Sequence, residues 1–108
     1  MRAASVAAAV ATLALAGCGE GSTAPPHHHV HLTPFERRGK VLFISTCGVC
    51  HSLADAATDG SAGPALNTPW LASRVRETIA DGPGGMPDTL LTGEKAAEVA
   101  AYVAAATK

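Results

Sequence analysis

Three residues with chemically useful side chains stand close together near the middle of the chain: Cys47, Cys50 and His51, in the order Cys-Gly-Val-Cys-His. Two thiols three positions apart lie on one helical turn, where each can add to a vinyl group of a haem. The histidine that follows offers an imidazole nitrogen as an axial ligand to the iron. A Cys-x-x-Cys-His run is therefore typical of a covalent attachment site for haem c.

Two other interpretations of the cysteines stay open. A Cys-x-x-Cys pair can be a reactive dithiol, whose first thiol has a lowered pKa, or it can supply two ligands of a zinc site. The dithiol interpretation expects a βαβ pattern nearby, and the sequence has no run of alternating β-branched and polar residues. The zinc interpretation needs further ligands, for which the candidates are His27, His28, His29 and His31.

Length and composition limit the chain to one small domain. It has 108 residues, a formal net charge of -1 and 47% hydrophobic residues, many of them alanine. Near-neutral charge gives no electrostatic reason to expect a nucleic-acid partner. The core of so small a domain is marginal, with only two Phe, one Trp and one Tyr, and a bound haem would supply the apolar surface that is missing.

The first 32 residues are expected to direct export of the protein and to tether it, rather than to form part of the folded domain. Residues 1–17, with Arg2 followed by a short apolar run, are typical of a signal peptide and too short to span a membrane. Leu-Ala-Gly-Cys at 15–18 resembles a bacterial lipobox, which implies lipidation of Cys18; the alternative is an ordinary signal peptide with a free Cys18 thiol. Residues 18–32 predict a flexible linker, whose histidines bind a metal ion, supply a ligand to the haem or are simply solvated.

Three segments beyond the linker predict helices. Thr33-Pro34-Phe35-Glu36 combines a cap, a proline at the first helical position and a capping box, and this helix should continue toward Cys47. Thr68-Pro69 repeats the pattern and predicts a helix from Trp70 to Ala80. A third, alanine-rich helix should follow Thr92. Residues 52–62 are expected to form a loop.

Together these motifs resemble those of the class I cytochromes c, particularly the bacterial mono-haem members, over about residues 32–108. The resemblance implies an all-α cytochrome c fold, with three to four helices around one covalently attached haem and with the N- and C-terminal helices crossing. The haem domain is expected to span residues 33–108. Gly39 and Phe43 match family positions that pack against the last helix, where Val99 and Tyr102 match the opposing positions.

The resemblance also implies roles for residues around the haem. Gly63-Pro64-Ala65-Leu66 matches a family segment whose proline carbonyl accepts a hydrogen bond from the ligand histidine, so Pro64 is expected to orient His51. Gly82–Pro87 matches the family's methionine loop, so Met86 is expected to be the second axial ligand. Trp70 either lines the haem pocket, with its indole N–H on a propionate, or is a core tryptophan without cofactor contact.

The implied function is one-electron transfer by one covalent haem c rather than an enzymatic reaction, because iron with two protein ligands leaves no open site for a substrate. The expected partners are redox proteins and, through the lipid, a membrane outside the cytoplasm; no nucleic acid or small-molecule substrate is expected. A haem c subunit of a membrane oxidoreductase complex is an alternative. An enzyme with Met86 off the iron, a metal-handling protein and a thiol–disulfide oxidoreductase are three others.

Overall fold

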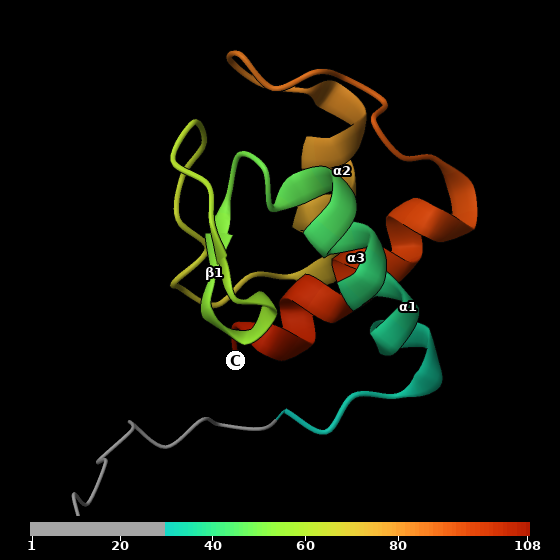
Figure 1. Cartoon of the computed structure of the whole chain (residues 1–108). Helices are drawn as coiled ribbons and strands as arrows, with labels where there is room; N and C mark the ends of the chain where they lie inside the picture. Colours follow the sequence, from blue (N-terminus) through green and yellow to red (C-terminus); the bar gives the residue numbers. More distant parts are fainter. Residues whose placement is uncertain (1–29) are drawn as a thin grey trace, which may run out of the picture.

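The computed structural model describes residues 30–108, and three α-helices dominate this part of the chain (Figure 1). The helices are α1 (Pro34–Leu42), α2 (Ala72–Asp81) and α3 (Gly93–Ala106). Helix α1 continues as a π-helical turn, η1 (Phe43–Cys47). The shorter elements between η1 and α2 are strand β1 (Ser52–Leu53), the 3₁₀ turn η2 (Ala54–Ala56) and strand β2 (Thr58–Asp59). The all-α fold predicted from the sequence is confirmed, with one small two-stranded sheet added to it.

Some of the sequence predictions fall outside the described residues. These are the signal peptide at 1–17, the lipidation of Cys18 and the part of the linker that holds His27, His28 and His29. Within residues 30–108, no helix is both long enough and apolar enough to cross a bilayer.

Helix α1 begins as its sequence predicts. The hydroxyl of Thr33 accepts a hydrogen bond from the N–H of Glu36 (3.2 Å), and the Glu36 carboxylate accepts one from the N–H of Thr33 (2.7 Å). Pro34 occupies the start of the helix, where its missing N–H costs nothing. This reciprocal capping sets the start of the helix that leads into the cysteines.

Helices α1 and α3 cross at the centre of the core. A Cβ on Gly39 would overlap the backbone carbonyl of Glu98 and crowd the Cβ of Tyr102, so glycine is what allows the two helices to come this close. One turn further along, Phe43 and Tyr102 are 1% and 0% exposed and pack edge to face, with ring centroids 5.8 Å apart. The expected crossing of the first and last helices is confirmed at these residues.

Two acidic side chains are largely buried at this crossing, and both have partners. Glu98 on α3 is 5% exposed and forms an ion pair with Arg38 on α1. Asp55 in η2 accepts hydrogen bonds from the Tyr102 hydroxyl (2.7 Å) and from Nζ of Lys40 (3.0 Å). Burial and this bond to Asp55 raise the pKa of Tyr102 above its usual value. Because the buried charges are paired, they join α1, η2 and α3 instead of destabilising the core.

The loop expected over residues 52–62 instead contains an antiparallel hairpin of β1 and β2. Each strand has only two residues, which is too short to show an alternating pattern in the sequence.

The predicted start of the second helix is also wrong. Helix α2 begins at Ala72 rather than at Trp70, and no side chain caps its first turn. The N–H of Trp70 instead donates to the hydroxyl of Thr107 at 3.0 Å. Where Thr68 and Pro69 predicted a local cap, the chain instead contacts the far end of the chain.

Candidate haem site

The turn that ends the first helical segment carries the two cysteines and the histidine. The N–H of Gly48 donates to the carbonyl of Phe43 (2.8 Å), and the N–H of His51 donates to the carbonyl of Cys47 (2.9 Å). Cys47 is half-buried and Cys50 is exposed, and both are free thiols. Both sulfur atoms are therefore available for covalent attachment of a cofactor.

The surroundings of Cys47 disfavour a reactive dithiol. Burial, and secondarily the neighbouring Cys50, raise the pKa of the Cys47 thiol to about 11. A disulfide oxidoreductase needs the opposite shift, because the thiolate is the attacking species. Among residues 30–108, moreover, no three His, Cys, Asp or Glu side chains lie close enough together to hold a metal ion, so this region offers no zinc site.

The imidazole of His51 lies against the backbone of the Gly63-Pro64 segment. Its Nδ1 is 2.7 Å from the carbonyl oxygen of Pro64. Because a carbonyl can only accept, Nδ1 must carry the proton, and Nε2 of the neutral ring keeps a lone pair that can bind a metal. A Cβ on Gly63 would overlap the ring, and the N–H of Gly63 bonds to the carbonyl of Cys50 at 2.8 Å. Both the tautomer and the orientation of the ring are thus set by backbone groups.

Met86 is brought to the domain by a tight return of the chain after α2. Gly82 ends the helix at φ +54°, and a Cβ there would overlap the backbone of Asp88. Beyond the turn, the N–H of Thr89 donates to the carbonyl of Ile79 at 3.0 Å, so the chain runs back along the end of α2. Met86 itself is half-buried and packs against the hydrophobic core.

Trp70 provides a test of whether this region fits a haem. Its indole Nε1 is buried and has no hydrogen-bond partner within the described chain. A buried donor without a partner is costly, and a haem propionate is an acceptor of the required kind. Cys47, Trp70 and Met86 all pack against the same core cluster. A thiol, a thioether and a buried indole N–H at this core, with Cys50 and His51 next to Cys47 in the chain, fit haem c.

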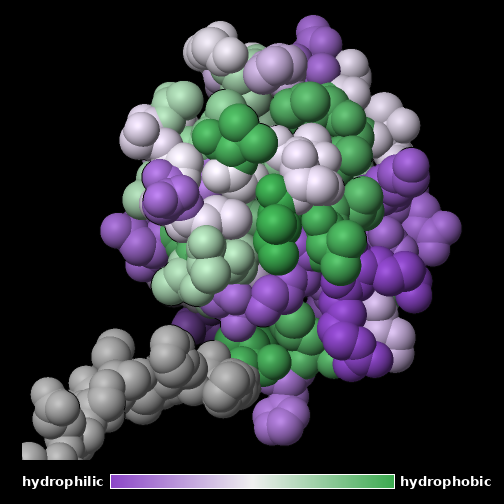
Figure 2. Space-filling model, in the orientation of Figure 1, coloured by the Kyte–Doolittle hydropathy of each residue, from purple (hydrophilic) through white to green (hydrophobic). Residues whose placement is uncertain are grey.

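Hydrophobic side chains gather over the middle of the face that Figure 1 presents, with hydrophilic residues around them (Figure 2). Within the described chain, the large hydrophobic residues with the highest exposed fractions are Val41 (67%), Val49 (73%) and Leu71 (74%). Exposed apolar surface of this kind on a small domain is typical of a site for a ligand or partner.

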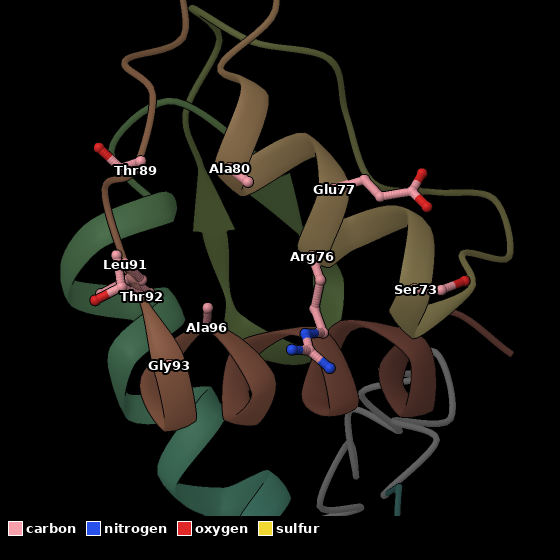
Figure 3. A pocket seen from close by; sticks show the side chains of 9 residues that line it. All are labelled: Ser73, Arg76, Glu77, Ala80, Thr89, Leu91, Thr92, Gly93 and Ala96. Atoms are coloured by element: carbon pink, nitrogen blue, oxygen red, sulfur yellow. The ribbon is translucent and has the colours of Figure 1, made fainter.

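A separate groove of about 500 Å³ lies between α2 and the segment that leads into α3 (Figure 3). Arg76 and Glu77 of α2 and Leu91 and Ala96 on the other side are among its lining residues, and Arg76 extends from α2 in the direction of α3. None of the site residues predicted from the sequence lines this groove, so it is distinct from the candidate haem site.

Two contacts of His51 were not predicted from the sequence. Gly63 lies against the ring, and its signal was available, since it precedes Pro64 in the matched segment. The hydroxyl of Thr58 donates to the carbonyl of His51 at 2.9 Å, and nothing in the sequence indicates this contact.

Comparison with known proteins identifies the family of the chain. Residues 34–103 match a family model described as "Cytochrome C oxidase, cbb3-type, subunit III". Among solved structures, the c-type cytochrome SorU from Sinorhizobium meliloti is similar, with 35% sequence identity and a TM-score of 0.61 over 68% of this chain and 91% of that one. A search of curated proteins found no match. Since the family model covers well over half of the chain, the protein belongs to this cytochrome c family and carries a covalently bound haem c.

Proposed function

We propose that this protein is a one-electron carrier in which His51 and Met86 are the axial ligands of the haem iron. The observation that carries the proposal is the 2.7 Å hydrogen bond from His51 to Pro64, on a histidine that directly follows two free thiols. When bound, haem c supplies a one-electron Fe(II)/Fe(III) couple. Cys47 and Cys50 would hold it covalently.

The residues around these atoms supply orientation. The Pro64 carbonyl accepts the hydrogen bond from Nδ1 and so fixes the orientation of the His51 ring. Trp70 would donate its buried indole N–H to a propionate, which gives that N–H the partner it lacks among the protein atoms described. The turn at Gly82 would bring the thioether of Met86 back to the domain. A carrier with two protein ligands has no open position for a substrate, which is why we propose electron transfer rather than an enzymatic reaction.

We further propose that the carrier works outside the cytoplasm, held to a membrane by a lipid on Cys18. The c-type cytochromes are typically extracytoplasmic, and residues 1–17 have the composition of a signal peptide that ends at a lipobox-like Leu-Ala-Gly-Cys. A linker over residues 18–32 would keep the haem domain near that membrane, where it would meet redox partner proteins.

Absorption spectra of the protein, produced in a host that attaches haem c, test the ligands. The oxidised protein should be low-spin with a sulfur-to-iron charge-transfer band, and Met86→Ala should lose that band. Leu90→Ala, a partly exposed position in the same loop, is the matched control and should keep it. A wild-type spectrum of haem c without the band would contradict Met86 and make the upstream histidines the next candidates.

A second candidate function is that of a haem c subunit in a membrane oxidoreductase complex. The observation that favours it is the family description, which names a subunit of an oxidase. Membranes solubilised in mild detergent and separated on a native gel distinguish the two functions by the position of the haem-stained band. A band at the mass of this chain alone supports a carrier, and a band that migrates with a large complex supports a subunit.

The remaining alternatives are tested on the same material. Mass spectrometry that finds haem on Cys47 and Cys50 would rule out metal-handling or thiol–disulfide roles that use these thiols. Rapid binding of carbon monoxide to the reduced protein would contradict ligation by Met86 and favour an enzyme.

A further inference from the structure

The hairpin of β1 and β2 packs directly against the turn that carries the haem-binding residues. A Cβ on Gly48 would overlap the methyl carbon, Cγ2, of Thr58. A Cβ on Gly60 would press on the carbonyl carbon of Cys50 and on the backbone nitrogen of His51. Two glycines, one in the turn and one just beyond β2, therefore allow the two pieces of backbone to touch.

The side chain of Thr58 bridges this contact with both of its groups. Its hydroxyl donates to the carbonyl of His51 at 2.9 Å and accepts from the N–H of Leu53 at 3.0 Å. One donor and one acceptor bond use the hydroxyl proton and one of its lone pairs. Its methyl group faces Gly48. Since the N–H of His51 is already bonded to Cys47, Thr58 completes the backbone hydrogen bonding of the histidine.

We propose that Thr58 is a positioning residue for His51, because its hydroxyl fixes the carbonyl of the histidine and hence the direction in which the side chain leaves the backbone. Pro64 holds the far end of the same side chain through Nδ1. Only two torsions separate the backbone from the ring, so anchoring both ends leaves the imidazole with one orientation. The inference rests on the proposed function, in which this ring is an axial ligand.

Three substitutions at position 58 separate the hydroxyl from the methyl group. Thr58→Val removes the hydroxyl, Thr58→Ala removes both groups, and Thr58→Ser keeps the hydroxyl alone. In the haem-loaded protein, Thr58→Val and Thr58→Ala should move the hyperfine-shifted NMR signals of the His51 ring. Both should also speed amide hydrogen exchange at Leu53 by roughly tenfold, since a bonded hydroxyl is lost. Thr58→Ser should keep the ring signals and the exchange rate close to those of the wild type.

Thr78→Val is the matched control, because the Thr78 hydroxyl also bonds a backbone carbonyl, that of Arg74 within α2, at 2.9 Å. It should leave the His51 signals unchanged. If Thr58→Val behaves as the wild type while Thr58→Ser and Thr58→Ala shift the ring signals, the methyl contact positions the turn and the proposal is wrong. If Thr58→Val does not accumulate as a folded protein, Thr58→Ala is compared with Thr58→Ser, which differs from it only by the hydroxyl. Equal ring signals in these two variants would then contradict the proposal.

Failure of the proposed function is a different result. In that case the wild-type protein itself would lack hyperfine-shifted signals from the His51 ring. Exchange at Leu53 would still report whether the Thr58 hydroxyl holds the backbone, so the two failures are distinguishable.

Discussion

Replacing Gly63 with alanine tests whether backbone contact sets the position of the His51 ring. The new Cβ would lie 2.5 Å from Cε1 and 2.9 Å from each ring nitrogen, well inside a favourable contact of about 3.5 Å. Gly63 is not at positive φ, so alanine adds no backbone strain. Overpacking costs about 1–3 kcal/mol, and loss of the hydrogen bond to Pro64 adds about 1 kcal/mol. We therefore expect Gly63→Ala to lower the free energy of unfolding by about 2–4 kcal/mol.

The assay is urea unfolding of the haem-loaded protein, combined with NMR of the His51 ring. Gly85→Ala is the matched control, because no atom lies within 4 Å of its Cβ and its φ is not positive. The control should change the free energy of unfolding by less than about 0.5 kcal/mol, with a small gain from the stiffer unfolded chain. It should also leave the His51 signals in place.

Equal stability of the two variants, with unchanged His51 signals, would refute the reasoning. It would show that the ring and the Gly63-Pro64 segment separate without cost. A loss of stability with unchanged ring signals would refute the positioning role as well, since the segment would then yield while the imidazole stayed where it is.

Three further predictions follow from contacts away from the ring. Gly39→Ala should lower the free energy of unfolding by about 3 kcal/mol in a urea titration, because its Cβ would overlap the carbonyl of Glu98 and force α1 from α3. Because the pKa of Tyr102 is raised in the folded state, its contribution to stability is complete below about pH 10 and is lost as the pH rises further, by about 1.4 kcal/mol per pH unit. In urea titrations between pH 10 and 11.5, Tyr102→Phe should therefore lose less stability with rising pH than the wild type. Ala57→Gly should raise the free energy of unfolding by about 0.5 kcal/mol, because Ala57 holds φ +52°; a urea midpoint that is unchanged or lower would contradict this account.

Those parts of the fold that depend on neighbouring residues could be predicted from the sequence. The capping box of Thr33 and Glu36 is complete within four positions, so the start of α1 followed from local chemistry. Gly39, unfavourable inside a helix, indicated a close approach of another helix, and α3 makes that approach. Met86 was a prediction from the resemblance, and its ligand role stays a prediction.

What could not be predicted depends on side chains that meet across long stretches of chain. Thr107 bonds the N–H of Trp70 from 37 positions away, just before α2 begins. Glu98 occurs in a helix where a charge normally indicates a solvent-facing position, yet Arg38 on another helix pairs with it in the interior. Local propensity contains no information about such partners, because they exist only once the chain has folded.

The two sides of the candidate site are built differently, and the difference bears on the proposed function. Everything that holds His51 lies between Cys47 and Pro64, and it acts on both ends of the side chain through backbone groups and one hydroxyl. Met86 instead follows Gly84 and Gly85, around which no atom lies within reach of a Cβ. Segments with few contacts open at low free energy, whereas a doubly anchored side chain does not. We therefore expect the histidine to supply the fixed orientation that a carrier with two protein ligands requires, whereas Met86 is held by the turn at Gly82 and by its packing against the core.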